Sequence, residues 1–323
     1  MESRPRRNRK SETVRALIRE TDISNSRLIA PLFLIDHPTN AREIGSLPGQ
    51  FQLGEEPLYR EIESSLNLGI KSFVLFPAVV ESLKNTEATY SYSKENFYLK
   101  RIAGIKQRFP ETLLISDVAY DPYSSDGHDG YVKDGKILND ESLPVLCKMA
   151  LAQAQAGIDM IGPSDMMDGR VGAIRSALDK DGYSEVSIMA YTAKYASAFY
   201  GPFRDALDSA PKFGDKKIYQ MDPANALEAL REAALDEAEG ADILMVKPAL
   251  SYLDIIYQIK QFSTLPIAAY NVSGEYAMIK AAAQKGWLDE EKVMKEVLLS
   301  IRRAGADMIL TYFAKDFARL SHG

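Results

Sequence analysis

Two lysines in this sequence follow short apolar runs that are expected to be buried strands, and a buried lysine can act as a nucleophile. Lys247 follows Leu-Met-Val within 241–249, and Lys194 directly follows the apolar segment 187–193. Burial favours the neutral amine over the ammonium ion, and a second amine nearby lowers the pKa of the first. A neutral lysine attacks a ketone to form a Schiff base. The pair therefore predicts Schiff-base chemistry on carbonyl substrates, with solvated or salt-bridged lysines as the alternative.

The segment between Tyr195 and Gln220 is too long for a simple connection from a strand to a helix. It contains aromatic and small residues, then Arg204 and the basic pair Lys216 and Lys217. An arginine guanidinium binds a carboxylate through two parallel hydrogen bonds. This composition predicts a lid that closes over an anionic substrate, and a surface loop with solvated charges is the alternative.

A loop rich in aspartate follows the third expected strand. Its four aspartates and His128 lie between residues 117 and 130, with glycines between them. Carboxylates in such a setting suit a hard cation such as Mg²⁺. The spacing is not that of a calcium-binding loop, and aspartates also stabilise turns. An ion that contacts the carboxylates directly and a loop without metal both remain open, and we expect His128 to be a hydrogen-bonding loop residue.

The apolar segments that carry these residues alternate with helical patterns along the chain. Between them, apolar residues recur at spacings of three and four, as helices that bury one face require. Alternating strands and helices predict a parallel sheet, and eight of them predict a (β/α)8 barrel, in which function lies at the C-terminal ends of the strands. An open doubly wound sheet is the alternative, but the glycine-rich nucleotide signatures of such sheets are missing. The eight expected strands are 28–35, 72–78, 112–120, 158–165, 187–193, 241–249, 265–273 and 306–314.

Three of the expected joints between a helix and a strand share one pattern. Each has a glycine that can end a helix in the left-handed conformation, and an aspartate two residues later that precedes an apolar strand. The glycines are Gly157, Gly240 and Gly305, and the aspartates are Asp159, Asp242 and Asp307. The pattern indicates a repeated structural joint within one domain.

Composition excludes several classes of protein. Of the 323 residues, 46% are hydrophobic and 26% are charged, which is typical of a globular protein. The net charge of −6 gives no reason to expect a nucleic acid partner.

No apolar run reaches the ~18 residues of a membrane span, and the N-terminus lacks an apolar signal region. Cys147 is the single cysteine, so neither an intrachain disulfide nor a zinc site built from cysteines is expected. We expect a reducing, cytoplasmic location and no membrane partner.

The first 27 residues precede the first expected strand. They contain a basic cluster formed by Arg4, Arg6, Arg7, Arg9 and Lys10. A solvated arm and an arm that docks on another subunit are both consistent with this cluster. We therefore divide the chain into an N-terminal arm, residues 1–27, and a catalytic barrel, residues 28–323.

From about Arg27 to Tyr312, the sequence resembles the porphobilinogen synthase (5-aminolevulinate dehydratase) family. The matching stretches include IGPSDMMDGRV at 161–171, SAFYGPFRDA at 197–206, LMVKPALSYLDI at 244–255 and YNVSGEYAM at 270–278. The resemblance implies a TIM barrel whose N-terminal arm embraces a partner subunit, assembled as a homo-octamer. It also implies condensation of two molecules of 5-aminolevulinate to porphobilinogen with loss of two waters, in tetrapyrrole (porphyrin, haem, chlorophyll) biosynthesis. No organic cofactor is expected.

The resemblance also assigns roles to the two lysines and to the lid. Lys247 looks like the lysine that holds the first substrate, which supplies the propionate side, and Lys194 like the lysine that holds the second, acetate-side substrate. Arg204 and Lys216 would bind the carboxylate of the second substrate, with Gln220 nearby. The family often has arginine where this chain has Lys216, so the charge is kept but the two-pronged hydrogen-bonding geometry is lost.

Four further residues are assigned to the first substrate by the same resemblance. Ser273 and Tyr312 would bind its carboxylate, and Asp117 and Ser164 would contact its amine end.

The resemblance sharpens the expectation about metals. Members that depend on zinc carry three cysteines in the loop after the third strand, and here the matching positions are Ala119, Asp121 and Asp129. Without thiolates a catalytic zinc of that type is not expected, and Asp121 and Asp129 are the candidate ligands for an active-site metal. The family also has a Mg²⁺ site at a subunit interface, and its ligand position matches Glu232, which is otherwise expected to be an exposed helix carboxylate. Mg²⁺ there would stabilise the assembled form.

Two other functions are compatible with the sequence. A class I aldolase also uses a barrel lysine and an iminium, although two lysines and a basic lid favour condensation of two substrates. A barrel without catalytic activity, serving as a binding scaffold, would tolerate replacement of Lys247. Retention of the whole set of site residues argues against the scaffold.

Overall fold

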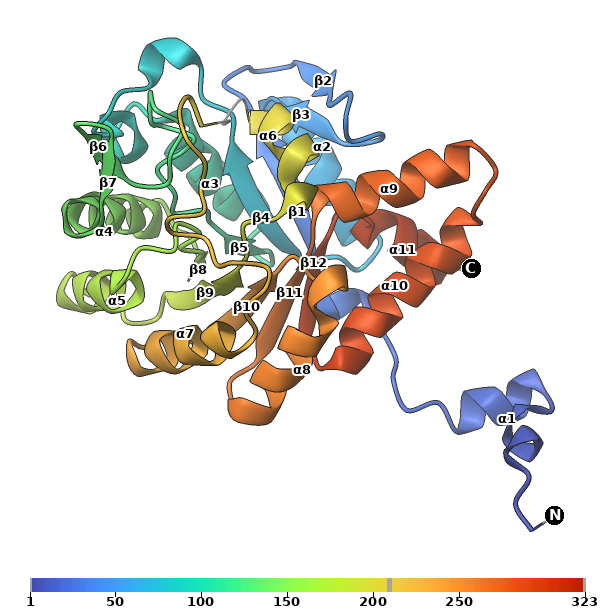
Figure 1. The fold of residues 1–323 in the computed structure, drawn as a ribbon. Helices are drawn as coiled ribbons and strands as arrows, with labels where there is room; N and C mark the ends of the chain where they lie inside the picture. The colour runs from blue at the N-terminus through green and yellow to red at the C-terminus, as the bar shows by residue number, and fades with distance from the viewer. Residues whose placement is uncertain (1, 208–210, 322–323) are drawn as a thin grey trace.

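Eight parallel strands close into a barrel in the computed structural model, which describes residues 2–207 and 211–321. The last strand pairs with the first through Leu28 with Ile309 and Ile29 with Leu310, and this pairing completes the ring (Figure 1). The expected (β/α)8 barrel is thus confirmed, and the open sheet is excluded. In spatial order the barrel strands are β1 (Leu28–Leu34), β4 (Ser72–Pro77), β5 (Leu113–Ile115), β8 (Met160–Ile161), β9 (Ser187–Lys194), β10 (Ile243–Lys247), β11 (Ile267–Asn271) and β12 (Met308–Thr311).

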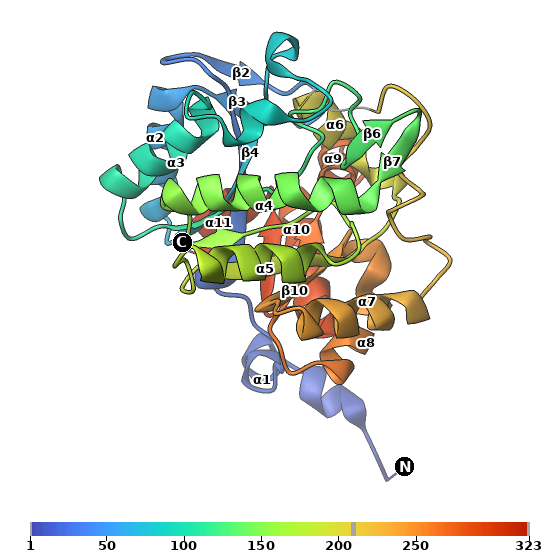
Figure 2. The same cartoon turned by 90° about the vertical axis from the view of Figure 1, so that its left-hand side faces the viewer.

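The helices lie on the outside of this ring, and each barrel strand is followed by at least one of them. Figure 2 shows two of these helices, α4 and α5, side by side along the outer face of the barrel. The barrel helices are α2 (Glu55–Leu66), α3 (Phe97–Arg108), α4 (Asn139–Gln155), α5 (Arg170–Lys180), α7 (Leu227–Ala238), α8 (Leu253–Phe262), α9 (Ser273–Gln284), α10 (Glu290–Ala304) and α11 (Ala314–Ser321). A short helix, α6 (Gly201–Leu207), belongs to the segment expected to be a lid, and two hairpins complete the fold: β2 (Ala41–Glu43) with β3 (Phe51–Leu53), and β6 (Tyr131–Lys133) with β7 (Lys136–Leu138).

Helix α10 illustrates how the sequence defines such a helix. The Asp289 carboxylate accepts a hydrogen bond from the Lys292 backbone N–H at 3.2 Å, which satisfies one of the free donors of the first turn. Gly305, with φ +125°, ends the helix. The buried residues of the helix recur at three- and four-residue spacing and form one apolar face against the barrel: Met294, Val297, Leu298 and Ile301.

The three glycine–aspartate joints fix the strands at the N-terminal end of the barrel. The glycines have φ between +96° and +125°, as expected for residues that end a helix. Each aspartate carboxylate accepts a hydrogen bond from a backbone N–H of the neighbouring strand. The bonds join Asp159 to Leu114 at 2.8 Å, Asp242 to Ile188 at 2.7 Å and Asp307 to Ile267 at 2.9 Å. The repeated sequence pattern is therefore a repeated link between adjacent strands.

Most strands are shorter than the sequence indicates, and two of them end well before the expected residue. The third and fourth were expected to span 112–120 and 158–165, but β5 ends at Ile115 and β8 at Ile161. Beyond these residues the two segments continue side by side only as an isolated bridge between Val118 and Pro163. A proline cannot donate to a strand ladder, which limits regular pairing here. The early end of these strands leaves loop backbone, and the side chains it carries, at the barrel mouth.

The N-terminal segment runs away from the barrel in both views (Figures 1 and 2). It forms a 3-10 helix, η1 (Pro5–Arg9), and a helix α1 (Glu12–Leu17), and neither contains a buried residue. Leu17 is 83% exposed and Ile18 is 48% exposed. Adjacent exposed apolar side chains are typical of a surface that contacts another protein. Among the described residues, no helix has the length and apolar character needed to cross a bilayer.

Candidate active site

Lys194 and Lys247 lie on adjacent strands at the C-terminal mouth of the barrel. They are register partners in the parallel pairing of β9 with β10, and both are buried. Register partners on neighbouring strands point to the same side of a sheet. The structure therefore brings together the two lysines that the sequence singled out, at the end of the barrel where function was expected.

Lys247 is enclosed by aromatic rings. Its Nζ lies 5.2 Å from the ring centroid of Tyr191, 5.1 Å from that of Tyr200, 5.0 Å from that of Phe203 and 4.7 Å from that of Tyr270. Burial, and then the positive charge of Lys194, lower the pKa of Lys247 to about 7, against the opposing effect of nearby carboxylates. A large fraction of Lys247 is therefore a neutral amine at neutral pH.

Lys194 has polar partners instead. Its Nζ lies 3.3 Å from the Asp129 Oδ2 and donates a hydrogen bond to the Ser164 carbonyl oxygen. The two lysines thus share the barrel mouth but have different surroundings, apolar for Lys247 and carboxylate-rich for Lys194.

The aspartate-rich loop supplies a buried ion-pair network. Lys216 Nζ lies 3.1 Å from the Asp121 Oδ2 and 2.9 Å from the Asp129 Oδ1. Burial would raise the pKa of Asp129, but the ammonium groups of Lys194 and Lys216 outweigh it and hold that pKa well below its usual range. Burial raises the pKa of Asp121, against the charge of Lys216. Of Asp121 and Asp129, Asp129 is therefore the carboxylate that stays ionised, and it contacts two lysines.

Asp117 lies on the same side of the mouth. Burial, and then the charge of Asp121, raise the pKa of Asp117 to about 7, while a hydrogen bond with Ser164 and the charges of both lysines oppose this rise. Its Oδ1 is buried without a hydrogen-bond partner among the described residues. A buried acceptor without a partner needs an explanation, and at a site of this kind a bound polar group supplies one.

The four remaining residues expected to bind carboxylates are spread around the lid. Arg204, on α6, makes no hydrogen bond or ion pair within the described chain, and Gln220 is buried with its Oε1 without a partner there. The Ser273 hydroxyl, at the start of α9, accepts a hydrogen bond from the Phe203 N–H at 3.1 Å. The Tyr312 hydroxyl is hydrogen-bonded to that of Tyr270 at 2.9 Å.

The lid segment is attached to both the strands and the loop. The Tyr200 hydroxyl donates to the carbonyl oxygens of Tyr195 and Lys247 at 2.8 and 3.2 Å. The Phe203 ring packs edge-on against Phe76 with centroids 5.0 Å apart. These contacts place aromatic lid residues directly above Lys247.

Sequence reasoning missed most of this aromatic enclosure. Phe203 and Tyr200 were noted only as lid aromatics, and Tyr191 and Tyr270 were not noted at all. Tyr191 lies on the same strand as Lys194, and Tyr270 on the strand next to Lys247. Tyrosines at inward-facing strand positions beside a lysine are the signal that could have identified them.

The candidate metal ligands have different neighbours. At Asp121 and Asp129, the Lys216 ammonium already contacts both carboxylates. Glu232, half-buried on α7, has its pKa raised by burial and by the nearby carboxylates of Asp236 and Asp168, in opposition to Arg170. In the described residues, no three His, Cys, Asp or Glu side chains converge closely enough to coordinate one ion directly. A Mg²⁺ ion held through one or two carboxylates and its own waters needs no such group.

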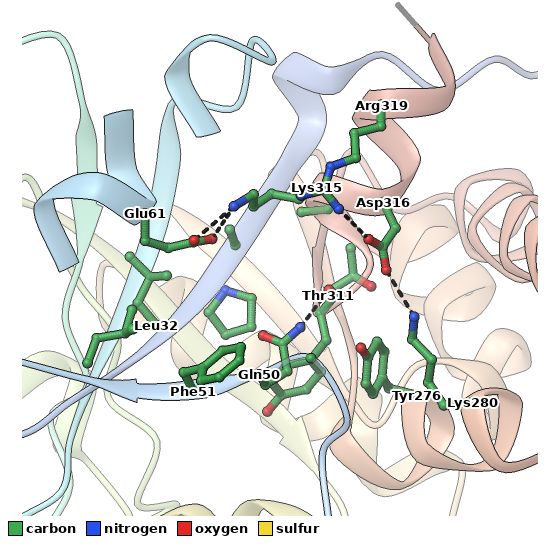
Figure 3. A pocket seen from close by; sticks show the side chains of 16 residues that line it. Leu32, Gln50, Phe51, Glu61, Tyr276, Lys280, Thr311, Lys315, Asp316 and Arg319 are labelled. Atoms are coloured by element: carbon green, nitrogen blue, oxygen red, sulfur yellow. Dashed lines mark hydrogen bonds and ion pairs between the residues drawn. The ribbon is translucent and has the colours of Figure 1, made fainter. Parts of the chain in front are cut away.

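A cavity of about 290 Å³ lies beside the mouth, lined by residues of β1, β12, α9 and α11 (Figure 3). It shares Tyr312 with the lysine site but is not lined by either lysine. Its charged side chains are held in ion pairs: Lys315 with Glu61, and Asp316 with both Lys280 and Arg319.

Comparisons with known proteins agree along almost the whole chain. A family model described as delta-aminolevulinic acid dehydratase matches residues 2–320. The chloroplastic delta-aminolevulinic acid dehydratase of Hordeum vulgare is 58% identical over 317 residues, covering 98% of this chain and 74% of that protein. The chloroplastic delta-aminolevulinic acid dehydratase 1 of Arabidopsis thaliana is 57% identical over 313 residues, covering 96% and 73%. A crystal structure of delta-aminolevulinic acid dehydratase (porphobilinogen synthase) from Toxoplasma gondii ME49, in complex with the reaction product porphobilinogen, matches with a TM-score of 0.97 at 53% identity, covering 99% of this chain and 92% of that chain.

The same relatives correct one expectation. The cytoplasmic location expected from the sequence is wrong, because the plant relatives are named chloroplastic, which points to a plastid. The expectation failed because its basis, a composition with one cysteine and no apolar signal region, indicates only a reducing compartment and does not distinguish one such compartment from another.

Proposed function

This chain belongs to the delta-aminolevulinic acid dehydratase family, and we propose a role for each site residue in the reaction of that family. The chain condenses two molecules of 5-aminolevulinate to porphobilinogen with loss of two waters, a step of tetrapyrrole biosynthesis. The observation that carries the proposed roles is the pair of buried lysines in register at the barrel mouth.

Lys247 forms the Schiff base with the first substrate. With a pKa of about 7 it presents a neutral amine, whose nitrogen attacks the ketone carbon, and the ketone oxygen leaves as water. The aromatic rings around Nζ exclude bulk water and favour the neutral form. The resulting iminium makes this carbon electrophilic, so that a carbon of the second substrate can attack it and form the carbon–carbon bond.

Lys194 holds the second substrate in the same way, next to the first. Asp129 lies beside it and compensates the positive charge of its iminium. The amine of the first substrate lies against Asp117, whose unpartnered Oδ1 accepts a hydrogen bond, and against Ser164. Formation of this second Schiff base releases the second water, and its iminium acidifies the adjacent C–H, whose carbon attacks the iminium carbon of the first substrate. The amine of the first substrate displaces Lys194 from the second substrate, elimination frees Lys247, and a final proton removal gives the aromatic ring.

The carboxylate of the second substrate binds Arg204, with Gln220 beside it. Arg204 has no internal partner among the described residues, so its guanidinium is available to an anion. Lys216 approaches the same carboxylate from its ion pairs with Asp121 and Asp129. In this role it shares its ammonium group between these aspartates and the substrate, and the guanidinium of Arg204 compensates the added negative charge.

The carboxylate of the first substrate binds Ser273 and Tyr312. Both hydroxyls now bond within the protein, Ser273 with the lid backbone and Tyr312 with Tyr270. The position of Ser273 in the first turn of α9 adds the positive end of that helix to the binding of an anion.

Enzymes of this family depend on a metal ion, and we assign Mg²⁺ to Glu232. The acidic surroundings of Glu232 fit a hydrated divalent cation, which would stabilise the assembled enzyme. For Asp121 and Asp129, the contacts with Lys216 favour the lysine as their cationic partner rather than an inner-sphere metal.

We further assign residues 1–27 to contacts between subunits of a homo-octamer, and residues 28–323 to the catalytic barrel. The exposed apolar pair Leu17 and Ile18 supports this assignment, because it lies at the end of α1, in the part of the arm that extends away from the barrel in both views. Deletion of residues 1–12 should lower the assembled mass in light scattering and leave the barrel folded.

Reduction with borohydride in the presence of 5-aminolevulinate tests the catalytic assignment. We expect an adduct on Lys247, and we expect the Lys194→Ala protein to retain that adduct while forming no porphobilinogen. Lys295→Ala, at an exposed position on α10, is the control and should behave as wild type. Absence of an adduct on Lys247 in the wild-type protein would rule out the mechanism.

A further inference from the structure

His128 lies between the aspartate-rich loop and the lid, and both of its ring nitrogens contact the lid. Its Nε2 is 2.9 Å from the Phe213 carbonyl oxygen, and its Nδ1 is 3.1 Å from the Tyr219 hydroxyl. The His128 side chain is buried, and its ring packs against that of Phe213 with centroids 4.5 Å apart. A histidine that contacts one lid segment at two places holds that segment against the loop.

The donors and acceptors of these contacts form one consistent chain. A carbonyl oxygen only accepts, so Nε2 carries the hydrogen that points at Phe213. In the neutral ring Nδ1 then accepts from the Tyr219 hydroxyl. The oxygen of that hydroxyl in turn accepts from the Asp129 backbone N–H at 3.2 Å. Tyr219 is therefore tied to both His128 and Asp129, two adjacent residues of the loop.

The segment held by His128 carries Lys216 at its centre. Phe213 lies three residues before Lys216 and Tyr219 three residues after it. Between these two attachment points, Lys216 reaches Asp121 and Asp129, and Asp129 also contacts Lys194. The two contacts of His128 thus flank the ion pairs that surround the second Schiff-base lysine.

We propose that His128 is a positioning residue that clasps the lid over the second-substrate site and so holds Lys216 and Asp129 in place beside Lys194. This inference rests on the proposed function, because it gives His128 a role only in binding the second substrate. Lys247 lies outside the clasp, since its neighbours are rings of the barrel and of the first part of the lid. Loss of the clasp therefore affects the second substrate and spares the first Schiff base.

Three variants of the full-length enzyme separate the two contacts. His128→Phe keeps a ring but removes both hydrogen bonds. His128→Gln keeps a donor near the position of Nε2, and Tyr219→Phe removes the hydroxyl. His37→Gln is the matched control, because His37 is an exposed histidine whose ring accepts hydrogen bonds only from Thr39 and Asn40 of its own turn.

We expect His128→Phe to raise the KM for 5-aminolevulinate about tenfold with a smaller fall in kcat, since each of the two lost buried hydrogen bonds weakens the closed lid about threefold. His128→Gln should restore part of the loss. Limited trypsin digestion should cut His128→Phe faster than wild type after the lid lysines Lys212, Lys216 and Lys217. Borohydride trapping on Lys247 should remain at the wild-type level in all variants.

Different outcomes test the role of His128 and the proposed function on which that role rests. If His128→Phe has wild-type KM and wild-type trypsin sensitivity, the clasp does not exist. If His128→Phe fails to fold, as judged by circular dichroism, the pair His128→Gln and Tyr219→Phe decides instead. Both variants remove the bond between Nδ1 and the hydroxyl, so their combined effect on KM should be smaller than the product of the single effects. Independent effects would overturn the proposal.

Failure of the proposed function would appear differently, as a wild-type protein without an adduct on Lys247.

Discussion

Lys194 and Lys247 lie at the barrel mouth as register partners, yet among the described residues only Lys194 has a carboxylate in contact with its ammonium group. Lys247 faces aromatic rings instead. Two amines of the same type are thereby made chemically different by their neighbours, which is what an enzyme needs if it must bind two copies of one substrate in different roles.

Schiff-base formation at Lys247 should depend on pH with a midpoint of about 7. The pKa of Lys247 is lowered to about 7, so below this pH the ammonium form dominates and cannot attack a ketone. The initial rate of borohydride trapping on Lys247 should rise with pH through 7 and then level off. Quantitative peptide mass spectrometry after short incubations measures it, and a midpoint near the ordinary lysine value would contradict the assignment.

The charge of Lys194 contributes to this low pKa, second only to burial. Lys194→Met removes that charge while keeping a chain of similar size. The midpoint for trapping at Lys247 should therefore move to higher pH, although no porphobilinogen is formed. Lys295→Met, remote and exposed, should leave the midpoint where it is; an unchanged midpoint in Lys194→Met as well would mean that the two amines do not interact.

Phe203 should be required for full activity at pH 7, because its ring keeps water away from Lys247. Its ring centroid is 5.0 Å from the lysine Nζ, and the ring packs on Phe76. Phe203→Ser admits water, so the pKa of Lys247 should rise, and a rise of one unit corresponds to about 1.4 kcal/mol and, at pH 7, to roughly a fivefold smaller neutral fraction. We expect kcat/KM at pH 7 to fall about fivefold and to recover partly at higher pH. Phe262→Ser, at an exposed aromatic position, is the control.

The fold was predictable because its signals are local. Eight apolar runs alternated with amphipathic helices, and the glycine–aspartate joints marked three strand starts. The ends of β5 and β8 were missed because Pro163 disrupts pairing between two segments that are far apart in sequence. Lys194 and Lys247 stood out individually, since an ionisable residue beside an apolar run is visible in sequence.

The surroundings of these residues were less predictable, because they come from contacts between distant segments. Lys216 contacts Asp121 across the barrel mouth, 95 positions away in the chain, and Tyr191 joins Tyr270 around Lys247 from different strands. The roles of individual substrate-binding residues came from the family resemblance, and they stay predictions.

Loss of either partner from the buried ion pair of Arg170 with Asp236 should destabilise the barrel. Arg170 Nη1 lies 2.8 Å from the Asp236 Oδ1, and both side chains are almost fully buried. Asp236→Ala leaves an uncompensated buried guanidinium, which costs about 3–5 kcal/mol in comparable sites. Urea denaturation at fixed protein concentration should show a clearly lower midpoint. Arg170→Met combined with Asp236→Leu should lose less than Asp236→Ala alone; an equal or greater loss would mean that packing rather than charge explains the effect.

Glu232 should make stability depend on Mg²⁺. Removal of Mg²⁺ by dialysis against a chelator should lower both activity and the thermal midpoint of wild type, and added Mg²⁺ should restore them. Glu232→Gln keeps the shape but removes the charge, so its thermal midpoint should no longer respond to Mg²⁺. Glu291→Gln, exposed on α10, should respond as wild type. An unaltered response in Glu232→Gln would place the ion elsewhere. Inhibition by a zinc-selective chelator, reversed by added zinc, would contradict the expectation that this chain uses no catalytic zinc.

Gly274 should be required for the lid backbone to pack closely against the first turn of α9. A Cβ at this position would lie 2.5 Å from the Phe199 carbonyl oxygen and 2.8 Å from the Phe199 Cα, both of them backbone atoms that cannot rotate away. Gly274→Ala must therefore separate the first turn of α9 from the lid, which also breaks the hydrogen bond between the Ser273 hydroxyl and the Phe203 N–H. Since Ser273 is assigned to the first-substrate carboxylate, we expect the KM for 5-aminolevulinate to rise about tenfold or more, with a modest loss of thermal stability. Gly45→Ala is the matched control, because a Cβ there meets nothing within 4 Å, and it should leave KM unchanged. Should Gly274→Ala bind 5-aminolevulinate as wild type does, close contact between the lid and α9 would not be needed for substrate binding.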